Sequence, residues 1–315
     1  MNRLSRALCE VDLFLNPKFP RASASPPGRL LRACAARVRG PVLNHLIRQD
    51  RARAAQILSA LPELSEIHAD YTHQTRSTGV EVSDYVRLYI AVRTLRPVSV
   101  LECGTGLSTT AIAYALHCND RDYGDAGHVI SMEESPEWYE EAIRCLPHLV
   151  ADYVRIVLSP RVDREHHRLR GVCYAAIPDE PYEFVFVDGP VHESPTTGDK
   201  LFDMDFAFVA ERIPSVQGLV DHRLDTILGL RRAVKKTHHV TYNPNRQTWV
   251  SLSPQTESVG EIIAFDLRIR LWRAPSSFSL YCLRRRFPAG EKESTMFHED
   301  PTSGSGCDPS NGGWI

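Results

Sequence analysis

The sequence predicts an α/β protein whose central sheet is mostly parallel and carries an antiparallel edge. Short apolar runs alternate with segments of helical periodicity between residues 98 and 234. This alternation is typical of parallel strands joined by helices that cover both faces of a sheet. After residue 237 the apolar runs follow one another without intervening helices, which predicts strands added antiparallel at one edge.

Composition divides the chain into four segments. Residues 1–40 are rich in Arg, Ala, Pro and Ser and predict a basic, weakly ordered arm. A helical lid is predicted over residues 41–80, because apolar residues recur at helical spacing from Leu43 to Leu61. The main domain is expected over residues 81–285. The polar residues 286–315 are rich in Gly, Ser and Pro, which predicts a disordered tail.

The strands of the main domain are predicted from short apolar runs bounded by polar or turn residues. Five are expected to be parallel, and four later runs are expected to form the antiparallel part. They are Val98–Leu101, Val129–Met132, Val154–Leu158, Phe184–Val187, Val216–Val220, His239–Tyr242, Thr248–Leu252, Ile262–Trp272 and Phe278–Leu283.

Helices are predicted between these strands from apolar residues that recur every three or four positions. Ser135 and Pro136 suit the N-cap and the first position of one of them. The other predicted helices are Val82–Leu95, Ser108–Leu116, Leu201–Ala210 and Leu224–Val234.

The overall composition excludes several classes of function. Apolar residues make up 43% of the chain, and the net charge of −2 argues against a general nucleic-acid binder. There is no apolar run of membrane-spanning length, and Glu10 and Asp12 interrupt the apolar stretch near the start, so we expect no secretory signal. The eight cysteines form no CxxC pair. We therefore expect a cytoplasmic protein with reduced thiols.

The segment VSVLECGTGLSTT, from Val98 to Thr110, leads from a buried strand through a glycine turn into a helix. Gly104 and Gly106 allow a tight turn and a close approach of the backbone to a ligand. The helix beyond them, with Ser108 or Thr109 as its expected cap, offers unpaired N–H groups.

The residues around these glycines indicate which cofactor the turn binds. A carboxylate at Glu102 would repel the pyrophosphate that dinucleotide sites place on such a turn. It would favour a cationic ligand instead. Thr109 stands where the dinucleotide fingerprint has its third glycine. Both departures favour S-adenosylmethionine over NAD.

This stretch, an acidic residue followed by GxG, resembles motif I of class I S-adenosylmethionine-dependent methyltransferases. The resemblance extends from about Val82 to Val234. It implies a Rossmann-like, doubly wound, seven-stranded sheet with an antiparallel edge and N-terminal helices. It also implies that Gly104 and Gly106 line the methionine part of the cofactor.

Two carboxylates, Glu133 and Glu134, end the second predicted strand. Dinucleotide folds bind ribose hydroxyls with an acid at this position, and the family resemblance also implies an acid here. A carboxylate can accept hydrogen bonds from both hydroxyls, so Glu133 is the expected ribose ligand, with Glu134 as its neighbour.

Acids also end the fourth and fifth predicted strands, at Asp188 and Asp221, the latter followed by His222. Ligands of open α/β sheets bind beyond these strand ends. The positions resemble the metal-binding acids of the catechol and caffeoyl-CoA O-methyltransferases. The stretch from Gly79 to Ser83 resembles the segment of that group that closes over the methionine end, which implies a cofactor contact for Ser83.

Two interpretations of these acids stay open. In the first, Asp188 and Asp221 bind Mg²⁺, which prefers oxygen ligands. In the second there is no metal, Asp188 positions cofactor or substrate, and His222 or Asp221 removes the acceptor's proton. The segment Asp188-Gly-Pro resembles a segment of polysaccharide O-methyltransferases related to this fold, which favours the second interpretation.

The sequence thus predicts methyl transfer from S-adenosylmethionine to a hydroxyl of a small molecule or saccharide. The alternatives are an NAD-dependent oxidoreductase on the same sheet and a non-catalytic protein that keeps the cofactor fold. We expect no nucleic-acid partner and no transmembrane segment, and a homo-oligomer is compatible with the sequence.

Overall fold

The computed structural model describes residues 44–254 except 46, 78–79, 222 and 243–249. Three groups of predictions lie outside the described residues: the basic arm, the last two strands and the polar tail. Residues 44–45 and 47–59 are helical, in agreement with the first predicted helix. Among the helices that the structure describes, none is long and apolar enough to cross a membrane.

The core of the fold is one twisted sheet in the order β3-β2-β1-β6-β7-β9-β8. Its first five strands are parallel, and β9 and β8 are antiparallel to their neighbours. The prediction of an α/β fold with a mostly parallel sheet and an antiparallel edge is therefore confirmed. The strands are β1 Ser99–Cys103, β2 His128–Glu133, β3 Val154–Leu158, β6 Phe184–Val187, β7 Gln217–Val220, β8 His238–Tyr242 and β9 Val250–Pro254.

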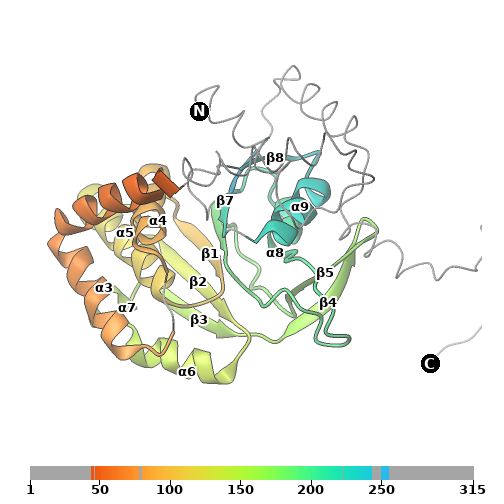
Figure 1. The fold of residues 1–315 in the computed structure, drawn as a ribbon, viewed down its shortest axis with the longest axis horizontal. Coiled ribbons are helices and arrows are strands. Elements are labelled where there is room, and N and C mark those ends of the chain that lie inside the picture. Colours follow the sequence, from red (N-terminus) through yellow and green to blue (C-terminus); the bar gives the residue numbers. More distant parts are fainter. Residues whose placement is uncertain (1–43, 46, 78–79, 222, 243–249, 255–315) are drawn as a thin grey trace, which may run out of the picture.

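Helices cover both faces of the sheet (Figure 1). Val100 on β1 packs in one apolar cluster with helices α3, α4 and α5, while the next residue, Leu101, packs in a second cluster with α8 and α9. Successive strand residues point to opposite faces, so burial of both faces explains why the strands read as continuous apolar runs. The helices are α3 Pro62–Gln74, α4 Val82–Leu95, α5 Leu107–Tyr123, α6 Pro136–Cys145, α7 His148–Ala151, α8 Asp205–Arg212 and α9 Leu224–Ala233.

The chain order creates a switch point between β1 and β6. From β1 the chain runs outward through β2 and β3, and it then returns to the other side of β1 as β6. The loops that leave the carboxyl ends of β1 and β6 therefore diverge to opposite sides of the sheet. In open α/β sheets this divergence opens a crevice in which ligands bind.

The prediction of a helix over Leu201–Ala210 was wrong at its start, since α8 begins at Asp205. The preceding residues are extended: Val172 N–H donates to the Phe202 carbonyl at 2.9 Å, and Met204 N–H donates to the Val172 carbonyl at 2.9 Å. A short apolar run is compatible with a helix or with an extended strand, so periodicity alone does not distinguish the two conformations at residues 201–204.

A β-hairpin that was not predicted lies between β3 and β6. It consists of β4 Arg161–His166 and β5 Leu169–Tyr174, joined by His167 and Arg168. Both turn residues have positive φ, +47° and +64°, as in a type I′ turn. Such turns normally carry Asn or Gly, and neither residue stands at positions 167 and 168, which explains why no hairpin was predicted here.

Candidate cofactor-binding site

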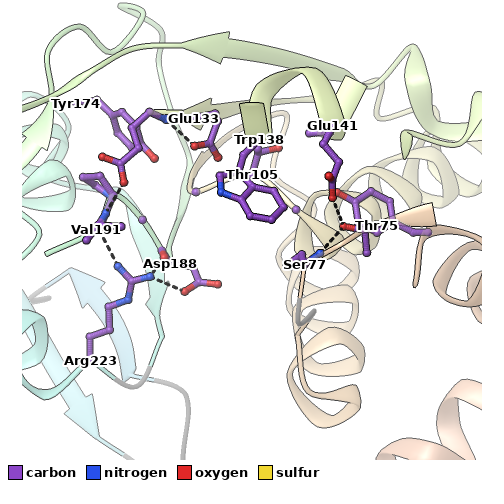
Figure 2. A pocket seen from close by; sticks show the side chains of 17 residues that line it. Thr75, Ser77, Thr105, Glu133, Trp138, Glu141, Tyr174, Asp188, Val191 and Arg223 are labelled. Carbon is purple, nitrogen blue, oxygen red and sulfur yellow. Dashed lines mark hydrogen bonds and ion pairs between the residues drawn. The ribbon is translucent and has the colours of Figure 1, made fainter. Parts of the chain in front are cut away.

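A cavity of about 220 Å³ opens at the carboxyl ends of β1, β2 and β6, at the switch point of the sheet (Figure 2). Its walls come from the loops after these strands, the first turns of α6, the end of α3 and the residue that precedes α9. The lining residues are Tyr71, Thr75, Ser77, Gly104, Thr105, Gly106, Glu133, Glu134, Trp138, Glu141, Ala142, Tyr174, Asp188, Gly189, Pro190, Val191 and Arg223.

The two glycines of the turn after β1 serve different purposes. Gly104 has φ +98°, and a Cβ there would lie 2.8 Å from the backbone nitrogen of Gly189. It therefore allows the β1 and β6 loops to touch. A Cβ on Gly106 would meet no atom within 4 Å, although this residue lines the cavity. Gly106 thus leaves open a space beside the loop that a side chain would fill.

Glu102 lies beneath this loop and not on the cavity wall. Its side chain is fully buried, and Oε2 accepts hydrogen bonds of 2.6 Å from Thr109 Oγ1 and from Ser131 Oγ. Oε1 is buried without a hydrogen-bond partner in the described part of the chain. Burial raises the pKa of Glu102 to about 7, against the opposing effect of the surrounding hydroxyls. Glu102 is thus a buried acid with unused acceptor capacity directly under the glycine turn.

Neither Ser108 nor Thr109 is the N-cap residue of the helix, so that prediction was wrong. Helix α5 begins at Leu107 with Gly106 as its N-cap, and Thr109 Oγ1 accepts a 3.0 Å hydrogen bond from Gly106 N–H. Both hydroxyl residues are buried and do not line the cavity. Thr109 instead links the glycine turn to Glu102, because its hydroxyl contacts both. Ser83, another predicted cofactor contact, is partly buried in the first turn of α4 and is not among the residues that line the cavity.

Glu133 and Glu134 both reach the cavity from the end of β2, but their surroundings differ. Glu133 Oε1 accepts the N–H groups of Glu134 and Ser135, each at 2.8 Å, which holds the carboxylate at the start of α6. Burial raises the pKa of Glu133, and those N–H groups oppose the shift. Glu134 accepts from Val191 N–H at 2.8 Å and from Arg161 at 3.0 Å. Glu134 therefore braces the β6 loop, while Glu133 is positioned by its own backbone.

Glu141 on α6 was not predicted, and it fastens the segment after α3 to the cavity wall. It accepts hydrogen bonds from Thr75 Oγ1 at 2.7 Å, Arg76 N–H at 2.8 Å and Arg76 Nε at 2.7 Å. Although its own burial opposes the shift, these donors lower the pKa of Glu141 to about 2. The Arg76 guanidinium also lies 5.7 Å from the ring centroid of Trp138. Thr75 and Arg76 lie more than 60 positions before Glu141 in the sequence, so no local pattern indicates this contact.

Asp188 at the end of β6 is paired with Arg223, which sequence reasoning also missed. Arg223 Nη2 lies 3.0 Å from Asp188 Oδ1 and also donates to the Asp188 carbonyl, while Nη1 donates to the Pro190 carbonyl at 2.8 Å (Figure 2). The pKa of Asp188 is raised by burial and by the neighbouring Asp221 carboxylate, and Arg223 opposes this. One guanidinium thus fixes both the acid and the loop that follows it.

The two strand-end acids do not fit a divalent cation as they are arranged here. Arg223 already supplies positive charge to Asp188, and its Nε lies 3.8 Å from Asp221 Oδ2. Among the described residues, no third His, Cys, Asp or Glu donor joins Asp188 and Asp221 as a metal-binding group. His222, one of the two residues predicted as the base, lies outside the described residues. The position of Arg223 therefore disfavours the magnesium hypothesis, which stays untested.

The chain is similar to solved methyltransferase structures. A methyltransferase from Geobacter sulfurreducens is 14% identical, with 65% of this chain and 98% of that chain covered and a TM-score of 0.40. The O-methyltransferase TomG from Streptomyces achromogenes, solved with SAM, is 18% identical, with 61% and 89% covered and a TM-score of 0.39. An O-methyltransferase from Bacillus cereus, solved with SAH, is 17% identical, with 62% and 91% covered and a TM-score of 0.39.

No protein-family model matches the sequence, and no curated protein matches it.

Proposed function

We propose that the protein is an S-adenosylmethionine-dependent methyltransferase that methylates a hydroxyl oxygen of a small molecule or saccharide. The observation that carries the proposal is the charge of the cavity wall. Four carboxylates line it against one cationic side chain, Arg223. Three of the acids pair with arginines, namely Asp188 with Arg223, Glu134 with Arg161 and Glu141 with Arg76, whereas Glu133 has no arginine partner among the described residues. S-adenosylmethionine carries a positive sulfonium and a positive ammonium group, which this wall would stabilise. The four acids are Glu133, Glu134, Glu141 and Asp188.

The residues around the cavity fit the parts of this cofactor. The space beside Gly106 suits the methionine portion, with the buried Glu102 carboxylate beneath it. Glu133 suits the ribose hydroxyls, because its carboxylate is held at the end of β2 and lines the cavity. When bound, S-adenosylmethionine supplies a methyl group that its positively charged sulfur activates for transfer.

The acceptor hydroxyl has to lose its proton as it attacks, so a base is needed near the transferred methyl group. Asp188 and Asp221 end neighbouring strands, β6 and β7, and His222 follows Asp221 in the sequence. We infer that this cluster provides the base. Arg223 fixes the orientation of Asp188, which is a positioning role.

The same charge distribution argues against the alternative of a nicotinamide-dependent oxidoreductase. A dinucleotide would place its pyrophosphate on the turn after β1. Glu133, which has no arginine partner among the described residues, lines the cavity and would face that group with like charge. A non-catalytic binding protein would have no need of the acids at the ends of β6 and β7, which favours an enzyme.

Equilibrium binding and a methyl-transfer screen test the proposal. Calorimetry with S-adenosylmethionine, S-adenosylhomocysteine and NAD⁺ should show binding of the first two and none of the third. A screen of phenolic, alcoholic and saccharide acceptors, with and without EDTA, should detect S-adenosylhomocysteine formation that EDTA leaves unchanged. Binding of NAD⁺ without binding of S-adenosylmethionine would overturn the assignment, and loss of activity in EDTA would restore the metal hypothesis.

A further inference from the structure

Two histidines and a glutamate meet away from the cavity, where the tip of the β4–β5 hairpin contacts α8. One donor atom each from His166, His167 and Glu211 lies within 4.8 Å of the others. His166 Nδ1 lies 3.7 Å from Glu211 Oε2. None of the three residues lines the cofactor cavity.

The backbone of the turn brings the two imidazoles together. Neighbouring residues in a strand point to opposite faces, which would separate His166 from His167. His167 instead occupies the positive-φ position that follows β4, and the two ring centroids lie 4.0 Å apart. The edge-to-face contact of His166 with Phe208, at 5.3 Å between ring centroids, orients the first imidazole. His166 retains only 9% of its side-chain exposure, whereas Glu211 retains 60%.

This donor set suits a transition-metal ion of zinc type. Imidazole nitrogens and carboxylate oxygens are typical Zn²⁺ ligands, with bonds of about 2.0–2.2 Å and tetrahedral geometry. Two ligands of one tetrahedral ion therefore lie about 3.4 Å apart. The 3.7 Å separation of His166 Nδ1 and Glu211 Oε2 is close to that distance, and all three donor atoms lie within 4.8 Å of one another. Rotation of the exposed side chains of His167 and Glu211 would bring the set to coordination distance.

We propose that His166, His167 and Glu211 form a Zn²⁺-binding site in which water completes the coordination. The ion would join the hairpin to α8. This site is independent of the cofactor cavity, so it stands or fails separately from the proposed methyltransferase activity.

The chain offers a matched control for the third donor. His128 Nε2 and Glu180 Oε2 form a 2.6 Å pair elsewhere on the protein, and no second histidine joins them in the described part of the chain. If a His–Glu pair were sufficient, this control pair would bind zinc as well. The proposal requires the second imidazole.

Zinc titration of the full chain, purified without a polyhistidine tag and stripped with EDTA, tests the site. Calorimetry, or competition with a chromogenic chelator, should show one Zn²⁺ per chain. His166→Ala, His167→Ala and Glu211→Gln should each weaken binding by at least about tenfold, since even loss of a supporting contact to a ligand costs that much. His128→Ala should bind zinc as the wild type does.

Cobalt gives an independent readout, because Co²⁺ in a tetrahedral site absorbs visible light more strongly than hydrated Co²⁺. The wild type should show this absorption, and Glu211→Gln should lose it while its thermal unfolding in EDTA stays unchanged. Glu211 is exposed, so this variant tests the site without disturbing the core. Absence of zinc binding in the wild type would overturn the proposal. So would a zinc affinity in the three ligand variants equal to that of the wild type.

Discussion

Arg223, the residue before α9, holds Asp188 at the end of β6, with Nη2 3.0 Å from Oδ1. The same guanidinium donates to the Pro190 carbonyl, so it fixes the carboxylate and the loop beyond it together. A planar group with several donors suits this task, since it reaches different acceptors at once. Arg223 thus supplies positive charge to both strand-end acids, at 3.0 Å from Asp188 and 3.8 Å from Asp221.

Arg223→Lys should lower the turnover of methyl transfer by about tenfold, because an ammonium cannot hold both Asp188 and the Pro190 carbonyl. The affinity for S-adenosylmethionine should change much less, since the Gly106 loop and Glu133 are untouched. Initial rates and calorimetry separate the two effects. Arg212→Lys is the control, because Arg212 forms an exposed pair with Asp179 at 2.5 Å. Equal rates in the wild type and Arg223→Lys would exclude the positioning role.

Gly104→Ala and Gly106→Ala should have opposite consequences. The first places a Cβ at φ +98° and 2.8 Å from Gly189 nitrogen, so it should cost about 2–4 kcal/mol of stability. The second places a Cβ in open space, so the free energy of unfolding should stay within about 0.5 kcal/mol. That Cβ projects beside the cofactor loop and should weaken S-adenosylmethionine binding.

Denaturant unfolding and calorimetry on both glycine variants check this contrast. A stable Gly106→Ala protein with unchanged cofactor affinity would show that the cofactor does not use the space beside the turn.

The parallel strands and the glycine turn could be predicted from the sequence because their signals are local. A run such as Phe184–Val187 is apolar because both sheet faces are covered, and Gly104 is required where two loops touch. Glu133 and Asp188 could be predicted for the same reason, since Glu133 is the last residue of the buried strand β2 and Asp188 directly follows the buried strand β6. The structure places both on the cavity wall.

The missed residues act through partners that are distant in the sequence. Arg223 contacts Asp188 across 35 positions, and Glu141 contacts Thr75 across 66. Neither pair has a fixed spacing that a pattern could reveal. Thr109 is not the N-cap residue that the sequence predicted, because its hydroxyl binds the Glu102 carboxylate, a contact that depends on how β1 and α5 pack.

Glu102 should make the protein less stable as pH rises from about 4.5 to about 7. Its pKa is about 7 in the folded chain and near its ordinary value of 4.5 when unfolded, so the folded state binds the proton more tightly. Ionisation in this interval therefore favours unfolding, by about 3 kcal/mol at pH 8 relative to pH 4.

Glu102→Gln should remove this contribution, so the variant should gain stability relative to the wild type as pH rises through the interval. Denaturant unfolding of both proteins at pH 4.5, 6 and 8 measures the difference, and the comparison cancels the effects of other groups. The loss of negative charge beneath the glycine turn should also weaken binding of the cationic cofactor. A difference in stability that does not vary with pH would contradict the prediction.

Glu141→Gln should release the segment that follows α3 from the cavity wall. The wild-type carboxylate accepts three hydrogen bonds from Thr75 and Arg76, and an amide cannot replace the charge-assisted bond to the guanidinium. We expect a loss of about 1–3 kcal/mol of stability at pH 7 and weaker S-adenosylmethionine binding, because Thr75 and Ser77 line the cavity.

The pH dependence of this effect has the opposite sign to that of Glu102. The pKa of Glu141 is lowered to about 2 in the folded chain, so its stabilisation is complete above the ordinary value of 4.5 and is lost as pH falls toward 2. The wild type and Glu141→Gln should therefore converge in stability under acid. Glu137→Gln is the matched control, because Glu137 also pairs with Arg76, at 2.9 Å, but is exposed. If Glu137→Gln and Glu141→Gln lowered cofactor affinity equally, the general charge of α6 would be responsible rather than the buried link to Thr75.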